Sequence, residues 1–335
     1  MHKIVVTGGA GFIGSNFVRY YMAAYPQAQV HVLDALTYAG NPANLESVSS
    51  SPRFEFTHGS ICDPAAVKAA CAGADAIINF AAESHVDRSI DNAGAFVQTD
   101  VAGIYVLLEF QRTAPGLRVL HVSTDEVYGS IEAGSFREDD ALRPNSPYSA
   151  SKAGGELLAR AYHVTYGSDI VVTRGTNTFG PNQYPEKVLP LFICNLIDGM
   201  PVPVYGSGNQ VRDWLYVDDH CRAIDLVLNQ GVSGEAYNVG GGNERTNLQI
   251  THRLLELLGK GSESIKHVED RPGHDWRYSV DTSKLQALGY TASGSFDDNF
   301  ASTVEWYLQN QEWWRAIRQS TDYVAFKQRW YANRS

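Results

Sequence analysis

The sequence contains little cysteine. Only four cysteines occur among 335 residues, and no two of them form a C-x-x-C pair; they are Cys62, Cys71, Cys194 and Cys221. Zinc sites and disulfide frameworks use patterned cysteines, so this distribution disfavours both. We therefore expect reduced thiols, no metal site and a cytoplasmic protein.

Basic residues are also few. Lys and Arg number 27 against 37 Asp and Glu, which gives a formal net charge of −10. Nucleic-acid binding needs a basic face, so we expect no nucleic-acid partner. No apolar run approaches the ~20 residues of a membrane span. The start, "MHKIVVTGG", leads directly into an expected strand rather than a signal peptide. We expect no membrane partner.

Short apolar runs that alternate with helical patterns are abundant. The expected strands are "KIVVTG", "QVHVLDA", "RFEFTHG", "DAIINFAA", "RVLHVST" and "DIVVTRG". Helical patterns such as residues 11–24 and 92–112 lie between them, as in successive βαβ units. The sequence therefore predicts an α/β fold with a Rossmann-type, doubly wound parallel sheet, covered on both faces because its strands are almost wholly apolar.

The pattern changes after about residue 175. Proline and glycine cluster in "GPNQYPEKVLP" and "GMPVPVYGSGNQ". Later helical patterns occur at residues 216–229, 247–258 and 296–310. We expect residues 1–175 to form a nucleotide-binding domain and residues 176–335 a smaller C-terminal α/β substrate-binding domain, with 212–240 returning to the first. A cleft between two such parts is a usual ligand site.

A glycine-rich stretch, "VTGGAGFIGSNF", follows the first expected strand. Gly8, Gly11 and Gly14 allow a tight turn whose backbone N–H groups approach a pyrophosphate at a helix N-terminus. Asp34 ends the second expected strand, 20 residues after Gly14, where an acid suits the adenosine ribose hydroxyls. That acid, and the lack of arginine in "DALT", favour NAD over NADP. An Asp34 that merely caps a turn is the alternative.

Tyr148 and Lys152 in "SPYSASKAGG" are four residues apart, so they share one face of an expected helix. A nearby ammonium stabilises a phenolate and is expected to lower the tyrosine pKa from about 10. Tyr148 is then a candidate base for a hydroxyl proton. The pattern is common by chance, and it gains meaning from the glycine-rich turn upstream.

Two adjacent acids, Asp125 and Glu126, follow another buried strand in "STDEVYG". Like charges repel and burial penalises both, so one of the two pKa values should rise. Successive strand residues point to opposite faces, so both acids serve one ligand only if the strand ends by Asp125. The alternative is a helix cap at Thr124 or Asp125 with acids in the first turn.

These motifs resemble the dTDP-glucose 4,6-dehydratase family of the extended short-chain dehydrogenase/reductase superfamily. Besides "TGGAGFIG", the matching stretches are "TYAGN", "FAAESHVDRSI", "STDEVYG", "YSASKA", "NQYPEKVLP", "RDWLYVDDH" and "DRPGHDWRY". The resemblance implies an NAD-dependent lyase that oxidises a nucleotide hexose at C4, removes water across C5 and C6, and returns hydride to C6. It assigns the C5 proton to Glu126, protonation of the C6 oxygen to Asp125, and the C4 oxygen to Thr124 and Tyr148.

The resemblance also implies a set of binding residues. Those expected at NAD are Gly8, Gly11, Phe12, Ile13, Gly14, Asp34, Ala35, Leu36, Thr37, Ser60, Ile61, Phe80, Ala81, Ala82, Thr99, Tyr148, Lys152 and Thr178. Those expected at the nucleotide sugar are Ser84, Thr124, Asn177, Lys187, Val188, Pro203, Tyr205, Arg212, Asn247, Asp270, His274 and Tyr278, several of them in the 270–278 segment. Arg212 is the expected phosphate contact, because a guanidinium grips phosphate through two donors.

Relatives often have two consecutive asparagines at Asn177–Thr178 and an aspartate at Ser60, so the nucleotide, dTDP or UDP, stays open. The resemblance further implies a homodimer through the helices expected at 95–111 and 148–165; packing within the monomer is the alternative. A UDP-glucose 4,6-dehydratase, a nucleotide-sugar 4-epimerase that needs only Tyr148, Lys152 and NAD, and a non-enzymatic NAD-binding scaffold are the alternative functions.

Overall fold

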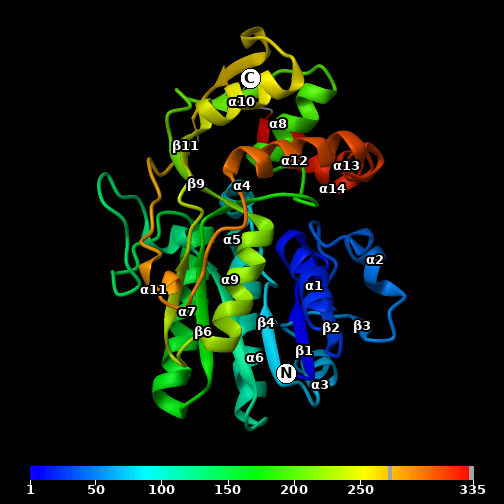
Figure 1. Ribbon diagram of the computed structural model, residues 1–335, viewed down its shortest axis with the longest axis vertical. Coiled ribbons are helices and arrows are strands. Elements are labelled where there is room, and N and C mark those ends of the chain that lie inside the picture. The colour runs from blue at the N-terminus through cyan, green and yellow to red at the C-terminus, as the bar shows by residue number, and fades with distance from the viewer. Residues whose placement is uncertain (271–273, 332–335) are drawn as a thin grey trace.

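The computed structural model describes residues 1–270 and 274–331 of the chain (Figure 1). The lower lobe in Figure 1 carries the N-terminus and a large sheet, and the upper lobe carries the C-terminal helices. Each lobe has its own apolar core, one built around the large sheet and one around Trp214, Trp314 and Phe300. A ligand site between the lobes is therefore held by two separately packed bodies.

The lower lobe contains a seven-stranded parallel sheet in the order β10-β6-β5-β4-β1-β2-β3. Its strands are β1 (Lys3–Thr7), β2 (Gln29–Asp34), β3 (Phe54–His58), β4 (Ala76–Asn79), β5 (Arg118–Thr124), β6 (Ile170–Gly175) and β10 (Ala236–Val239). The predicted doubly wound parallel sheet is confirmed. The strand order reverses between β1 and β4, and ligands of such sheets bind at the carboxyl ends of the strands at this switch point.

Helices cover both faces of this sheet. One face packs on α1 (Phe12–Ala24) and α9 (Val217–Gln230), and the other on α3 (Pro64–Cys71), α6 (Ile104–Arg112) and α7 (Pro147–Tyr166). Shorter elements of this lobe are η1 (Pro42–Leu45), α2 (Glu46–Ser49), α4 (Val86–Asp91), α5 (Ala93–Phe96), the π-helix η2 (Val97–Gly103), η3 (Asp125–Tyr128) and α11 (Ser283–Gln286). The apolar strands are thus shielded from water on both sides, as their sequences require.

Local sequence signals fix both ends of α7. Ser146 and Ser149 form a reciprocal capping box, with each hydroxyl accepting the other's backbone N–H at 3.1 Å, and Pro147 occupies the first turn. The helix ends at Gly167, whose φ of +68° is the left-handed conformation that glycine adopts without strain. A cap of this kind stabilises a helix by ~1 kcal/mol. These signals set the position of Tyr148 and Lys152 along α7.

The upper lobe combines two small sheets with helices. One sheet pairs β11 (Glu244–Thr246), β9 (Val211–Tyr216) and β7 (Asn177–Phe179), and the other pairs β12 (Ile265–Val268) with β8 (Val202–Tyr205). The helical elements are α8 (Val188–Ile197), α10 (Asn247–Leu258), η4 (Ser262–Ser264), α12 (Phe296–Gln309), α13 (Gln311–Arg318) and α14 (Thr321–Tyr331). This lobe is the smaller α/β part that the sequence predicts.

The segment 212–240 runs through both lobes. Its β9 pairs with β7 and β11, whereas α9 packs against α1 and β10 pairs with β6 in the large sheet. The limits of the two domains, 1–175 and 176–335, stay a prediction.

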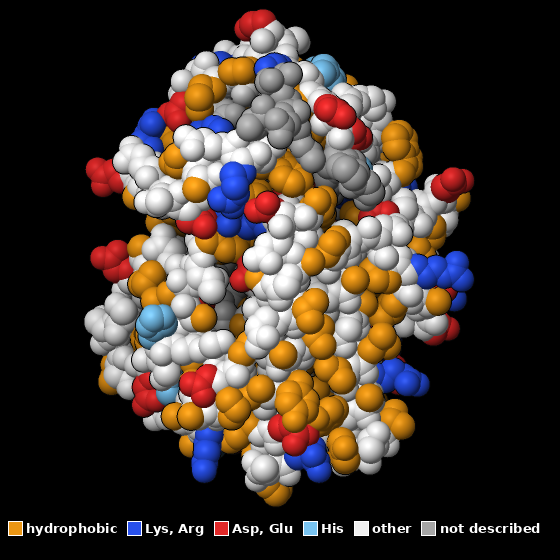
Figure 2. All heavy atoms as spheres, turned by 180° about the vertical axis from the view of Figure 1, so that it is seen from behind, with side chains coloured by type: hydrophobic (Ala, Val, Ile, Leu, Met, Phe, Trp, Pro, Cys, Tyr) orange, Lys and Arg blue, Asp and Glu red, His pale blue; other side chains and the backbone are white. Residues whose placement is uncertain are grey.

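An apolar surface lies on the long helix formed by α5, η2 and α6. By length and composition, residues Ala93–Arg112 would suffice to cross a membrane, which corrects the expectation that no such stretch exists; core helices of soluble proteins pass the same test. Only 33% of its most apolar window is buried. Tyr105 on this helix and Leu157 and Val164 on α7 are exposed. Figure 2 shows hydrophobic side chains gathered over the lower lobe on the face opposite to Figure 1.

Candidate active site

The glycine-rich turn between β1 and α1 leaves no room for side chains. Gly8 has a φ of +67°, and a Cβ added there would lie 2.6 Å from the backbone nitrogen of Ala81. A Cβ on Gly14 would lie 2.3 Å from the carbonyl oxygen of Gly8. The turn therefore presents bare backbone at the start of α1, which is the arrangement that a pyrophosphate needs.

Asp34 ends β2 beside this turn and is buried. Its carboxylate accepts the backbone N–H of Ala10 and that of Leu36, each at 2.8 Å. Burial raises the pKa of Asp34, and the two N–H donors oppose that rise. Asp34 therefore holds the turn in place, as the alternative interpretation proposed, and it also lines the cavity described next. Leu36, whose φ is +50°, does not line that cavity.

A cavity of about 320 Å³ runs along the carboxyl ends of the central strands. Every residue expected at the cofactor lines it except Leu36. Of the residues expected at the sugar, Ser84, Thr124, Asn177 and Lys187 also line it. Sequence inspection missed further lining residues, although most of them lie within the matching stretches beside the residues that were named; they include Ala39, Gly40, Glu83, Ser123, Thr176, Gln183, Tyr184 and His220.

The acid pair begins where β5 stops. Thr124 is the last residue of β5, and its hydroxyl accepts the Glu126 backbone N–H at 3.3 Å, which caps the one-turn helix η3. This turn brings Asp125 and Glu126 to the same cavity as Tyr148. The strand ends before Asp125, as it must if both acids are to reach one ligand. Thr124 also caps a helix, as the alternative interpretation proposed.

Asp125 is only 2% exposed. Burial, reinforced by the nearby carboxyls of Glu126 and Asp213, raises its pKa well above the usual range. The Thr124 hydroxyl donates to its Oδ1 at 3.2 Å, and within the described residues its Oδ2 has no hydrogen-bond partner. The surroundings of Asp125 therefore favour its protonated form, which has a proton to give.

Tyr148 and Lys152 line the same cavity from α7. The Lys152 Nζ donates to the Val122 carbonyl at 2.8 Å. Burial, with contributions from Glu126 and Asp100, raises the pKa of Tyr148 well above 10. The prediction that Lys152 lowers the pKa of Tyr148 is wrong for the protein without ligands, because burial and the nearby carboxyls raise that pKa. Burial also lowers the pKa of Lys152, and Asp100 opposes that effect.

A second cavity, of about 150 Å³, adjoins the first. Glu126, Asn177 and Lys187 line both cavities. Among the residues expected at the sugar, the second cavity is lined by Val188, Pro203, Tyr205, Arg212, Asn247 and His274. The two cavities thus form one continuous candidate site that extends from the large sheet into the upper lobe.

Two expected substrate residues stand behind this lining. Asp270 binds His274 Nδ1 at 2.6 Å, and the Tyr278 hydroxyl donates to Asp275 at 2.5 Å; neither lines the cavity. The Tyr278 ring lies under the Arg212 guanidinium, 4.4 Å from its centroid. Residues 271–273 of the expected 270–278 segment lie outside the described residues.

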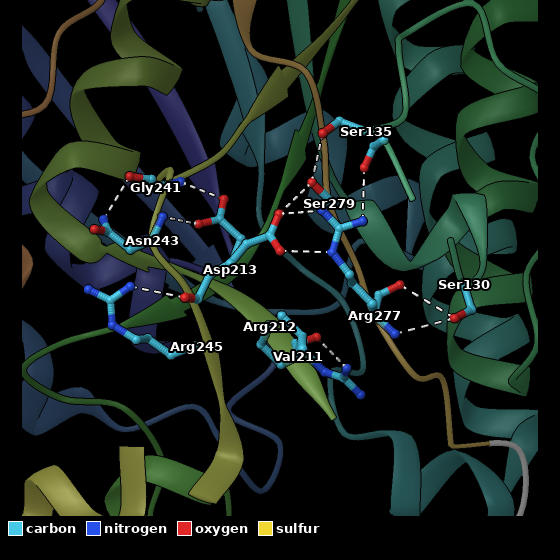
Figure 3. A network of polar contacts seen from close by, with 12 residues as sticks. Ser130, Ser135, Val211, Arg212, Asp213, Gly241, Asn243, Arg245, Arg277 and Ser279 are labelled. Carbon is cyan, nitrogen blue, oxygen red and sulfur yellow. Dashed lines mark hydrogen bonds and ion pairs between the residues drawn. The ribbon is translucent and has the colours of Figure 1, made fainter. Parts of the chain in front are cut away.

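A polar network fixes the strand that carries Arg212 (Figure 3). Its neighbour Asp213 accepts the backbone N–H groups of Gly241 at 2.9 Å and Asn243 at 2.6 Å. On the adjacent strand β11, Glu244 pairs with Arg277 at 2.7 Å. Arg212 itself donates to backbone carbonyls, including that of Val211 at 2.7 Å. The guanidinium is therefore held by the backbone where it lines the second cavity.

The sheet, the glycine-rich turn at its switch point and the Tyr-x-x-x-Lys helix beside it define the extended short-chain dehydrogenase/reductase class. Within this class the chain belongs to the GDP-mannose 4,6 dehydratase family, whose model matches residues 5–303.

Individual relatives cover nearly the whole chain. A dTDP-glucose 4,6-dehydratase of Streptomyces niveus is 51% identical over 321 residues, which are 94% of this chain and 96% of the relative. The crystal structure of DesIV, a dTDP-glucose 4,6-dehydratase of Streptomyces venezuelae solved with NAD bound, is 54% identical with a TM-score of 0.92 and covers 94% of this chain and 99% of that chain. A UDP-glucuronic acid 4-epimerase of Bacillus cereus has a TM-score of 0.86 at 27% identity over 92% of this chain and 99% of that chain. The fold alone thus does not separate dehydratases from epimerases.

Proposed function

We propose that the protein is an NAD-dependent hydro-lyase that converts dTDP-glucose to dTDP-4-keto-6-deoxyglucose. The observation that carries the proposal is the pair Asp125–Glu126, which reaches the same cavity as Tyr148 and Lys152 from the end of β5. The similarity to dTDP-glucose 4,6-dehydratases over almost the full chain supports the same substrate. An epimerase would need only the tyrosine and lysine.

The first cavity fits NAD. The bare backbone at Gly8 and Gly14 would take the pyrophosphate, and Asp34 would take the adenosine ribose. When bound, NAD supplies a hydride acceptor for C4 and a hydride donor for C6. The protein's part is to hold the sugar against it and to move protons at C4, C5 and C6.

At C4, the sugar hydroxyl must lose a proton as the ketone forms. Tyr148 is the base that we assign to this proton, with the Thr124 hydroxyl orienting the same oxygen. Lys152 provides the positive charge that offsets the phenolate once it forms, and its own hydrogen bond to Val122 fixes its position. Because the pKa of Tyr148 is high in the protein alone, this charge is needed for proton transfer at neutral pH.

At C5 and C6, one proton is removed and one is donated. The 4-ketone acidifies the C5 proton, which Glu126 accepts. Asp125, kept protonated by burial, gives its proton to the C6 oxygen, and water leaves as the C5–C6 double bond forms. A carboxyl whose surroundings raise its pKa is suited to the acid role beside a neighbouring carboxylate that acts as the base.

The second cavity would hold the nucleotide end of the substrate. Arg212 and Lys187 bring positive charge to its lining, which suits a diphosphate. Asn177, Tyr205 and Asn247 supply further polar atoms there. Asn177–Thr178 and Ser60 depart from the usual pattern, so the discrimination between dTDP and UDP is part of the test.

We further propose a cytoplasmic homodimer. The exposed apolar face on Ala93–Arg112 and α7, with Val97, Tyr105, Leu157 and Val164, would be covered by the same face of a second copy in a helix bundle. A self-complementary patch of this kind closes into a two-fold dimer.

The function is tested by incubating the purified protein with dTDP-glucose and, separately, UDP-glucose while following product mass. We expect loss of one water from dTDP-glucose without added reductant, and no turnover by Tyr148→Phe. A product of unchanged mass would select the epimerase, and preferential conversion of UDP-glucose would correct the nucleotide. Absence of any product from either sugar would refute the proposal.

A further inference from the structure

Arg88 lies at a point where three distant parts of the chain meet, although it lines neither cavity. It belongs to α4, the later part of the "FAAESHVDRSI" stretch, for which the proposed chemistry gives no role. Its side chain is only 12% exposed. A charged side chain at this depth needs partners to offset its desolvation.

The guanidinium is held by two carboxylates and by two aromatic rings. Its Nε donates to the Glu186 carboxylate at 3.0 Å, and a terminal nitrogen donates to Asp322 at 2.8 Å. Its carbon lies 3.7 Å from the ring centroid of Tyr38 and 4.3 Å from that of Phe326. A lysine ammonium has neither the fork nor the plane for this arrangement.

Each partner belongs to a different part of the site. Tyr38 stands between Thr37 and Ala39, which line the first cavity. Glu186 directly precedes Lys187, which lines both cavities and donates to the carbonyl of Ser84. Asp322 and Phe326 are on α14, the C-terminal helix beside α13 (Figure 1).

We propose that Arg88 is a positioning residue that ties the cofactor-side segment 37–40 to the substrate-side segment 183–188, with α14 as its backing. The inference rests on the proposed function for the identity of the two ligands. Burial raises the pKa of Glu186 to about 7 even though Arg88 and Lys187 oppose the rise, so loss of Arg88 would raise it further. Removing one partner of a buried pair leaves an uncompensated charge.

The coupling is tested first by hydrogen exchange on the intact protein, comparing wild type with Arg88→Met and Asp322→Asn. Arg88→Met should speed amide exchange at least tenfold in both segments, 37–40 and 183–188. Asp322→Asn, which removes the charge from one edge contact and keeps both rings, should speed exchange mainly in α14. Arg329→Met is the matched control, because its exposed pair with Asp91 joins the same two helices at 3.3 Å; it should leave both segments unchanged.

The consequence for binding is measured by NAD retained through gel filtration and by the KM for dTDP-glucose. Arg88→Met should lose bound NAD and raise KM about tenfold with kcat within threefold of wild type, and Arg88→Lys should restore little of either. Wild type without turnover on dTDP-glucose would defeat the proposed function, yet NAD retention and exchange would still decide the coupling. Faster exchange confined to one segment, or a lowered melting temperature with NAD retention and KM unchanged, would overturn it.

Discussion

Two aspartates lie at the carboxyl ends of parallel strands of the same sheet, and their surroundings differ. Asp34, the last residue of β2, accepts two backbone N–H groups, whereas Asp125, the first residue after β5, receives one hydroxyl and faces two other carboxyls. Backbone donors favour an ionised carboxylate, and carboxyl neighbours favour a protonated one. On the cofactor side, each carboxylate oxygen of Asp34 thus has a backbone hydrogen-bond donor. On the reaction side, burial and the neighbouring carboxyls raise the pKa of Asp125, and the proposed chemistry uses the proton that this keeps on it.

The largest expected effect lies on the reaction side, at Glu126. Glu126→Gln removes the base for the C5 proton, so elimination should slow by about 10²–10⁴-fold. Oxidation at C4 should continue, because Tyr148 and Lys152 are untouched, and absorbance of bound NADH should accumulate in stopped-flow traces. Elimination at the wild-type rate would show that Glu126 is not the base for the C5 proton.

A second test concerns Asp100, a buried acid on the reaction side. Burial raises its pKa to about 6 from 3.8, while Lys152, the Ser151 hydroxyl and the Glu83 N–H oppose the rise. The folded pKa is the higher one, so the contribution of Asp100 to stability is complete below pH ~4 and is lost as the pH rises through 6. Over this window Asp100→Asn should gain on the order of 3 kcal/mol relative to wild type.

Urea unfolding of the Asp100→Asn variant and wild type at four pH values between 4 and 7.5 measures this difference. Using the difference cancels the other groups that titrate in the same range. A difference in free energy of unfolding that does not change with pH would show that ionising Asp100 does not destabilise the folded protein.

The smallest expected effects are on the stability of the folded protein, where Asp34→Asn and Asp125→Asn should differ. Asp34→Asn loses one acceptor for a buried N–H and should cost about 1–3 kcal/mol. Asp125→Asn loses no backbone partner and should leave stability within about 1 kcal/mol or raise it, because a group that resists ionisation is removed. Thermal unfolding without added NAD compares the two; greater destabilisation by Asp125→Asn would contradict the comparison.

Local signals carried much of the prediction. The glycines, Asp34 and the spacing of Tyr148 and Lys152 act within one turn or one strand end, so sequence alone locates them. The requirement that β5 end by Asp125 followed from side-chain alternation, and Thr124 is indeed the last residue of that strand.

Long-range surroundings were not predictable. The pKa of Tyr148 depends on burial and on the carboxyls of Glu126 in η3 and Asp100 in η2, and the tyrosine–lysine spacing says nothing of them. Arg88 meets Asp322 across 234 positions of sequence, without any pattern to signal it. Asp270 and Tyr278 match a motif, yet folding places them behind the cavity wall, where they contact His274, Asp275 and Arg212.

The π-helix η2 joins the cofactor cavity to the outward apolar face along one helix. Thr99 within it lines the cofactor cavity, and Tyr105 shortly after it points to solvent on the apolar face. A π-turn amounts to one extra residue in an α-helix. Because the wider turn takes up that residue within η2, the helix beyond it keeps the angle that an uninterrupted α-helix one residue shorter would have. The surplus residue is therefore accommodated locally, and the outward apolar face keeps its orientation relative to the inward cofactor cavity.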